Sequence, residues 1–108
     1  MPEDCLFCQI RDKKLEADIV AEDGDTVIFR DKFPKASTHL LIIPKTHVES
    51  ILTLEEKAMD LPGMLILKAK KFAADRGIAG YRLTFHVGRE GGQIVDHVHL
   101  HLMAEQAI

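Results

Sequence analysis

The chain has 108 residues, 46% of them hydrophobic, which predicts a single globular domain over residues 1–108 with enough apolar side chains for a core. Its 14 Lys and Arg nearly balance its 17 Asp and Glu, and because no basic block is present we expect no nucleic-acid partner. No apolar run is long enough to cross a membrane, and Glu3 and Asp4 lie where a signal peptide is basic, so we expect a cytoplasmic protein without a membrane partner.

The N-terminal region holds both cysteines of the chain, Cys5 and Cys8, separated by two residues. This spacing is typical of zinc ligands, and a cytoplasmic chain keeps both thiols reduced. A redox role is disfavoured because no βαβ unit surrounds the pair. A closed tetrahedral zinc site needs two further ligands, and histidines are available. The spacing alone leaves zinc binding open.

Three short strands are predicted next. Residues 19–22 and 26–30 flank an Asp-Gly-Asp turn at 23–25, which favours a hairpin. Residues 39–43 form an almost continuous apolar run that ends at Pro44, as expected for a buried strand.

The middle of the chain has the spacing of one main helix. Thr53 is predicted to cap the helix N-terminus, with Glu56 completing a capping box, and Gly77 to end it. Pro62 either kinks this helix or marks the start of a second one capped by Asp60. Apolar residues recur at helical spacing at Leu65, Ile66, Ala69, Phe72 and Ala73.

The C-terminal region predicts two strands, 81–87 and 95–103, joined by a Gly-rich loop at 88–92. The loop is too short for a parallel crossover, so we expect an antiparallel sheet with the helix packed on it, an α+β fold.

The last predicted strand has histidine at three alternate positions, His97, His99 and His101. Alternation places the three imidazoles on one face and the apolar residues between them on the other. Same-face neighbours lie about 7 Å apart, while zinc–nitrogen bonds are about 2 Å, so three histidines of an extended strand do not share one ion without distortion. Three half-exposed sheet histidines with no role are the less probable interpretation, because these groups titrate near neutral pH.

Other residues indicate a phosphate site less specifically. The loop glycines, followed by Gln93, are able to form a backbone nest for an anion, although most such loops are simple hairpin turns. Their place beside the histidines favours the phosphate interpretation. His39 and His47 flank the buried strand, and a single histidine in such a place is more often structural than catalytic.

Taken together, these residues resemble the histidine triad superfamily, and within it the Hint branch. The resemblance runs nearly end to end and is carried by residues 5–8, 29–31, 38–47 and 91–102. The last of these segments, with His-φ-His-φ-His preceded by Gly-Gln-Ile-Val, is highly specific. The resemblance implies a HIT-like fold: a five-stranded antiparallel sheet, one main helix and a short N-terminal helix. It also implies a homodimer that pairs through the helix and an edge strand, for which 81–87 has a suitable pattern.

The resemblance implies a nucleotide-binding hydrolase that cleaves purine nucleoside phosphoramidates through a nucleotidyl-histidine intermediate. By analogy, His99 is the nucleophile, and His101, His39 and Gln93 hold or polarise phosphate oxygens and the leaving group. Asp31 corresponds to the family's ribose ligand, and the base is enclosed by an apolar wall. The implied nucleotide-binding residues are Phe7, Ile10, Phe29, Asp31, Leu41, His86 and Gly92. Either purine suits such a site.

Zinc-containing relatives imply a ligand set for the cysteine pair. In this sequence the set is Cys5, Cys8, His47 and His97. Four protein ligands close the coordination sphere, so the implied Zn²⁺ is structural and fixes the N-terminus to the catalytic strand.

Three positions depart from the family pattern. His86 stands where relatives usually have Asn or Gln, Ile94 replaces a small polar residue that donates to the leaving group, and Asp96, expected on the opposite face or in solvent, replaces an aromatic or aliphatic one. The first two motivate an alternative, a nucleotide-binding regulatory protein with weak or lost catalysis. A zinc-stabilised interaction module without a nucleotide role is the third hypothesis.

Overall fold

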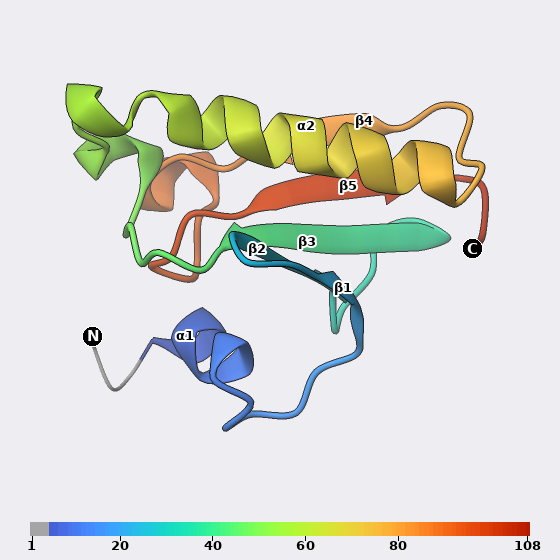
Figure 1. Ribbon diagram of the computed structural model, residues 1–108, viewed down its shortest axis with the longest axis horizontal. Coiled ribbons are helices and arrows are strands. Elements are labelled where there is room, and N and C mark those ends of the chain that lie inside the picture. The colour runs from blue at the N-terminus through green and yellow to red at the C-terminus, as the bar shows by residue number, and fades with distance from the viewer. Residues whose placement is uncertain (1–4) are drawn as a thin grey trace.

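The computed structural model describes residues 5–108 as one antiparallel sheet with a helix on each face (Figure 1). The spatial order of the strands is β1-β2-β3-β5-β4, and all neighbouring strands are antiparallel. The strands are β1 (Ile19–Glu22), β2 (Thr26–Arg30), β3 (Thr38–Pro44), β4 (Arg82–Phe85) and β5 (Leu100–Ala104). The helices are α1 (Leu6–Arg11) and α2 (Asp60–Asp75), with short 3₁₀ turns at Ile51–Thr53, Glu56–Ala58 and Arg89–Gly91. The predicted α+β fold is confirmed.

The central strand, β3, is buried along its whole length because both of its faces are covered. Leu40 and Ile42 pack with α2 in the larger core, while Leu41 and Ile43 pack with α1 in the smaller one. The sheet therefore separates two apolar layers, which explains why this strand is an almost continuous apolar run instead of an alternating one.

The start of the main helix agrees with one of the two predicted alternatives, a helix that begins at Asp60, but the predicted capping box does not form. Ser50, not Thr53, begins the capping box: its Oγ accepts the N–H of Leu52, and Oγ1 of Thr53 accepts the N–H of Ser50. This box closes a 3₁₀ turn, and α2 begins only at Asp60, after Met59 as N-cap. Pro62 lies in the first turn of α2, where its missing N–H has no intrahelical partner to lose.

The end of α2 is as predicted. Gly77 adopts φ 71°, a left-handed conformation that costs glycine little. Its N–H bonds the carbonyl of Ala74, and the N–H of Ile78 bonds that of Ala73, which is a Schellman motif. Ile78 then packs into the larger core, so the turn is fixed by both hydrogen bonds and burial.

The histidine strand is shorter than predicted. β5 begins at Leu100, and residues 95–99 are irregular. Here the N–H of His97 bonds the carbonyl of Val95, and the N–H of Val98 bonds that of Val48, a partner outside the sheet. Strand pairing is replaced by local and loop contacts, so only His101 of the three histidines belongs to a strand.

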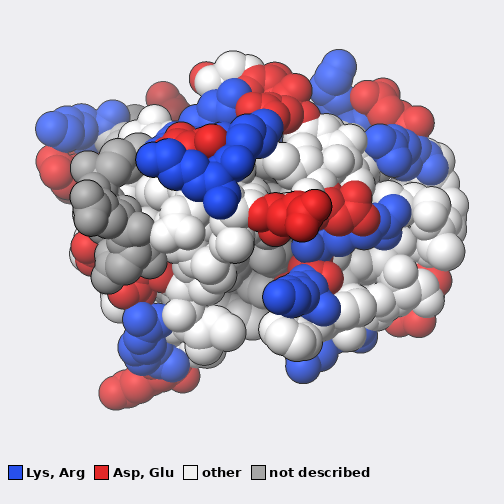
Figure 2. Space-filling view, turned by 90° about the horizontal axis from the view of Figure 1, so that it is seen from below, with Lys and Arg blue, Asp and Glu red and all other residues white. Residues whose placement is uncertain are grey.

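The surface on the side of α1 carries charges of both signs close together (Figure 2). Ion pairs join β1 and the turn after it to other elements: Glu22 contacts Lys13 and Lys45, and Asp23 contacts Lys68 of α2. Within residues 5–108, no helix combines the length and the apolar composition that crossing a membrane requires.

We predict that the larger core, not helix propensity, stabilises α2. Leu65 is fully buried, whereas Leu67, two residues further along the same helix, is 64% exposed. Leu65→Ala should lower the free energy of unfolding by about 2–5 kcal/mol through lost burial and a residual cavity. Urea unfolding checks this value, with Leu67→Ala as the matched control, which should cost less than about 1 kcal/mol. Equal losses in the two variants would contradict the packing described here.

Candidate functional site

Three histidine rings form a buried row that begins in the irregular segment and ends in β5. His97 is 0% exposed, His99 6% and His101 8%. All three lie on the α1 side of the sheet: the ring of Phe7 from α1 contacts His97 and His99 edge-on, and the rings of His99 and His101 lie 5.0 Å apart. The common face predicted from alternation is therefore retained, although the backbone is not a regular strand.

The first histidine of the row belongs to a cluster with the cysteine pair. Sγ of Cys5 lies 3.4 Å from Nδ1 of both His47 and His97. Sγ of Cys8 lies 3.3 Å and 3.5 Å from the same two nitrogens, which are 3.1 Å apart. The four ligand atoms lie within 4.8 Å of one another.

These distances fit a tetrahedral metal ion. With zinc–sulfur and zinc–nitrogen bonds of about 2.3 and 2.0 Å, tetrahedral ligands have S···N separations of about 3.5 Å and an N···N separation of about 3.3 Å. The separations in the cluster agree with these values to within a few tenths of an ångström. The donor set, two thiols and two imidazoles, leaves no position for a substrate. The cluster can therefore bind a metal ion that has a structural role.

The protonation states of the ligands suit metal binding. Nε2 of His97 donates to the carbonyl of Pro44 at 2.8 Å, which leaves the Nδ1 lone pair directed into the cluster. Burial lowers the pKa of His97 to about 4, so the ring is neutral at pH 7. Burial and the neighbouring Cys5 thiol raise the pKa of Cys8 to about 11, so without a cation this thiol keeps its proton.

The middle histidine has its tautomer fixed by the backbone. Nδ1 of His99 lies 2.7 Å from the carbonyl oxygen of His97, and because a carbonyl only accepts, Nδ1 carries the proton. The other nitrogen, Nε2, therefore has a free lone pair. Burial lowers the pKa of His99, which keeps this lone pair unprotonated at pH 7. A buried, neutral imidazole oriented in this way can act as a nucleophile.

The last histidine of the row is oriented through a chain of hydrogen bonds. The N–H of Lys35 donates to Nδ1 of His39, so the proton of His39 lies on Nε2, 2.9 Å from Nδ1 of His101 and 3.3 Å from Oδ2 of Asp31. Nδ1 of His101 then accepts, and its own proton lies on Nε2. This Nε2–H is buried and has no partner among the described residues. It is a buried donor that an acceptor atom would satisfy.

The predicted apolar wall lies next to these rings. Phe7, Ile10, Phe29 and Leu41 all belong to the smaller core and are at most 6% exposed. The rings of Phe7 and Phe29 contact each other edge-on with centroids 5.4 Å apart. The structure thus brings the four residues together between α1 and the sheet, directly beside His99.

The polar predicted residues border the same place. Oδ1 of Asp31 accepts the N–H of Phe33, and the side chain remains 19% exposed, so its carboxylate has lone pairs free for further donors. The half-buried His86 stacks on His101 with ring centroids 4.5 Å apart. Gly92 has φ 92°, and a Cβ there would lie 3.6 Å from Nδ1 of His86. Four imidazoles therefore meet around His101.

The Gly-rich loop is organised differently from the predicted phosphate nest. The N–H groups of Gly91 and Gln93 bond the carbonyl of Gly88, and that of Gly92 bonds Arg89. These three donors are used inside the loop and do not form an anion nest. Asp96 is 63% exposed and paired with Arg89, which confirms its predicted place in solvent.

Gln93 is buried and bonded to the backbone through both ends of its amide. Nε2 donates to the carbonyls of Glu49 and Val95, and Oε1 accepts the N–H of Gly88. Both amide hydrogens are therefore occupied, and Gln93 as placed here holds the loop against the segment after β3. A contact between Gln93 and phosphate requires one of these bonds to break.

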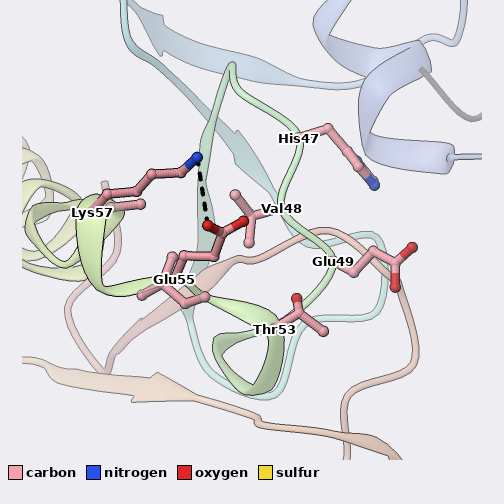
Figure 3. A pocket seen from close by; sticks show the side chains of 8 residues that line it. His47, Val48, Glu49, Thr53, Glu55 and Lys57 are labelled. Carbon is pink, nitrogen blue, oxygen red and sulfur yellow. Dashed lines mark ion pairs between the residues drawn. The ribbon is translucent and has the colours of Figure 1, made fainter.

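Two cavities flank the cysteine–histidine cluster, and neither is lined by His99 or His101. The first, about 320 Å³, is lined by residues 47–49, 53–55, 57 and 58. In Figure 3, His47 points toward α1, away from the Lys57–Glu55 ion pair. The second, about 390 Å³, is lined by Cys5, Leu6, His47, Glu49, Arg89, Ile94, Val95 and Asp96.

The sequence prediction missed the backbone groups that orient the rings. The carbonyls of Pro44 and His97 and the N–H of Lys35 each fix one imidazole tautomer. Since every residue except proline carries the same backbone donor and acceptor, nothing in the sequence marks these positions.

Comparisons with known proteins agree with this geometry. Residues 4–107 match the family model described as "Scavenger mRNA decapping enzyme C-term binding". The chain is 38% identical over 102 residues to protein HitA of Neisseria gonorrhoeae, covering 94% of this chain and 95% of that protein.

Two solved structures are also similar to this chain in sequence and fold. A HIT family hydrolase from Legionella pneumophila superposes with a TM-score of 0.90 at 43% identity, covering 95% of this chain and 94% of that one. A histidine triad protein from Clostridium difficile superposes with a TM-score of 0.93 at 32% identity, covering 100% and 96%.

The buried ring of His101 should make folding sensitive to acid. Burial, followed by the neighbouring His99, His86 and His39, lowers its pKa to about 4, below the value of about 6.5 expected in the unfolded chain. Between these values the unfolded state binds a proton that the folded state does not, so stability is present above pH 6.5 and is lost as pH falls. His101 alone should contribute about 2 kcal/mol of this loss between pH 7 and pH 5.

Urea unfolding at pH 7, 6 and 5 measures this effect in wild type and in His101→Asn, both saturated with zinc. The variant should lose less stability over the interval by about that amount. An identical pH dependence in the two proteins would show that His101 does not titrate as described.

Proposed function

Because this chain belongs to the histidine triad (HIT) family, we propose that it is a nucleotide-binding hydrolase that cleaves purine nucleoside phosphoramidates. The observation that carries the proposal is the pair of oriented imidazoles. His99 presents a free Nε2 lone pair, and the adjacent His101 presents a buried Nε2–H without a partner. A nucleophile and an oxyanion donor side by side are what a displacement at phosphorus requires.

In the proposed reaction, Nε2 of His99 attacks the α-phosphorus and the phosphorus–nitrogen bond to the amine breaks. The amine leaves with a proton taken from solvent, which the attacking water of the second step later returns, and the nucleotidyl group is carried on His99. Water then attacks the same phosphorus, the bond to His99 breaks, and the nucleoside monophosphate is released. The covalent intermediate divides one difficult displacement into two easier ones.

The remaining pocket residues have proposed binding roles. Nε2–H of His101 donates to a phosphate oxygen, and His39 holds His101 in the required tautomer. Asp31 accepts from ribose hydroxyls, and the apolar wall of Phe7, Ile10, Phe29 and Leu41 encloses the base. His86 and Gly92 border the phosphate end, and Gln93 positions their loop.

A specific observation supports the alternative, a nucleotide-binding regulatory protein with little turnover. Ile94 is 82% exposed and supplies no polar donor for the leaving group, and His86 adds a fourth imidazole to the site. In that case the nucleotide binds but no covalent adduct accumulates. A zinc-stabilised interaction module binds no nucleotide at all.

We also propose a homodimer. β4 pairs only with β5 in the described sheet, so its other edge has backbone groups available to a second strand. The residues proposed for hydrolysis all come from one chain, so turnover would not require the second copy.

Turnover and intact mass test the enzymatic proposal. With adenosine and guanosine phosphoramidates as substrates, wild type should form a nucleotidyl adduct, and His99→Ala should form none and lose kcat/KM by at least about 10³-fold. Added imidazole should partly restore hydrolysis in His99→Gly by occupying the vacated space. Nucleotide binding without any adduct or hydrolysis in wild type would favour the regulatory alternative. If AMP does not bind at millimolar concentration, both nucleotide-binding hypotheses are excluded and only the interaction module remains.

We propose Zn²⁺ as the occupant of the cysteine–histidine cluster, where it compensates the buried thiolates and links α1 to the segment before β5. Metal analysis of the purified protein should find about one zinc per chain. Cys8→Ala should reduce this value to near zero and lower the melting temperature. Wild-type protein without zinc, or Cys8→Ala with a full equivalent, would refute the ligand assignment.

A further inference from the structure

Three further potential metal-ligand atoms, from Asp31, His39 and His101, lie close together. Asp31 directly follows β2, His39 lies in β3 and His101 in β5. Nε2 of His39 is 2.9 Å from Nδ1 of His101 and 3.3 Å from Oδ2 of Asp31, and these three atoms all lie within 4.8 Å of one another. We propose that Asp31, His39 and His101 form a second metal site, which binds a divalent transition-metal ion.

The spacing of these atoms suits an octahedral ion. For metal–ligand bonds of about 2.1 Å, neighbouring octahedral ligands lie about 3.0 Å apart. The two separations from Nε2 of His39, 2.9 Å and 3.3 Å, bracket this value. Two imidazoles and one carboxylate on one side of an ion form the arrangement that first-row transition metals accept, with the remaining positions open. The partly exposed carboxylate gives the ion a route from solvent.

The hydrogen bonds leave one lone pair on each ligand ring. Nδ1 of His39 accepts the N–H of Lys35, and Nδ1 of His101 accepts the Nε2–H of His39, so each ring carries its proton on Nε2. Oδ1 of Asp31 accepts the N–H of Phe33, which turns Oδ2 toward His39. This backbone bond acts as the outer support that metal-binding carboxylates commonly have.

Metal binding requires one rearrangement. Nε2 of His39 carries the proton that now lies between Asp31 and His101, and this proton must move to Nδ1 to free the lone pair. Nδ1 currently accepts the N–H of Lys35, so that hydrogen bond breaks. Lys35 is exposed, so water can replace the lost acceptor. No proton is released overall, since His39 only changes tautomer.

This site goes beyond the proposed hydrolysis and does not depend on it. The two are linked only through shared residues: the ion would occupy the carboxylate of Asp31, which is proposed to contact ribose, and Nδ1 of His101, opposite the Nε2–H proposed to contact phosphate. The ion and the nucleotide should therefore compete for Asp31.

Cobalt titration of zinc-saturated protein tests the site in the absence of nucleotide. One Co²⁺ per chain should bind without thiolate-to-cobalt absorption, which separates this site from the cysteine cluster. Asp31→Asn and His39→Gln should each weaken the binding by about tenfold or more. Asp75→Asn, an equal charge change at an exposed position on α2, is the matched control and should stay within twofold. Co²⁺ binding accompanied by thiolate absorption, or unchanged in both site variants, would overturn the proposal.

Hydrogen exchange gives a second readout that needs no variant. In wild type, Co²⁺ should accelerate exchange of the Lys35 amide, because its acceptor on His39 is lost. An unchanged Lys35 amide at full occupancy would also overturn the proposal. Hydrolysis is measured separately, so loss of the proposed function and loss of this metal site are distinguishable.

Discussion

His97 connects the two parts of the site through three of its groups. Its Nδ1 faces the thiols of Cys5 and Cys8, its Nε2–H is held by the carbonyl of Pro44, and its own carbonyl accepts the Nδ1–H of His99. The tautomer of His99 thus depends on the backbone position of a residue whose side chain belongs to the metal cluster. A shift of that cluster moves the acceptor that keeps the reactive lone pair on Nε2.

This dependence explains why the chain before β5 is irregular. A regular strand would extend the pairing with β3 back to residue 97 and direct its N–H groups into the ladder. Instead, Val98 bonds the carbonyl of Val48, next to His47, so the segment follows the loop after β3. The same displacement brings Nδ1 of His47 and Nδ1 of His97 to 3.1 Å. The β3–β5 pairing therefore stops before residue 99, where the geometry of the cysteine–histidine cluster requires a different backbone path.

The sequence predicted most of the fold because its periodicities are strong. The strands at 19–22 and 26–30, the buried strand at 39–43 and the stop at Gly77 all appear where expected. The predicted capping box was wrong because Ser50 and Thr53 satisfy the same pattern as Thr53 and Glu56, whereas the alternative of a second helix beginning at Asp60 was correct apart from its cap, which is Met59. Within the site, the residue types indicated which side chains lie together, but the sequence did not indicate their hydrogen-bond partners. Nε2 of Gln93, for example, donates to the carbonyl of Glu49, which is 44 positions away and has no local sequence signal.

His101 and the three imidazoles around it form a buried cluster whose unsatisfied donor destabilises the fold, and a ligand can satisfy this donor. Burial lowers the pKa of His39, His99 and His101, so these rings are neutral at pH 7. Nε2 of His101 is buried without a partner among the described residues, so the folded chain contains a desolvated donor. A phosphate oxygen at that nitrogen would satisfy the donor, and a metal ion at the opposite nitrogen would use the lone pair that now accepts from His39. Both ligands act on one ring, but through different atoms and with opposite charge. The β3–β5 pairing holds His39 and His101 together, so the site can bind either ligand, and the tautomer of His39 decides which one.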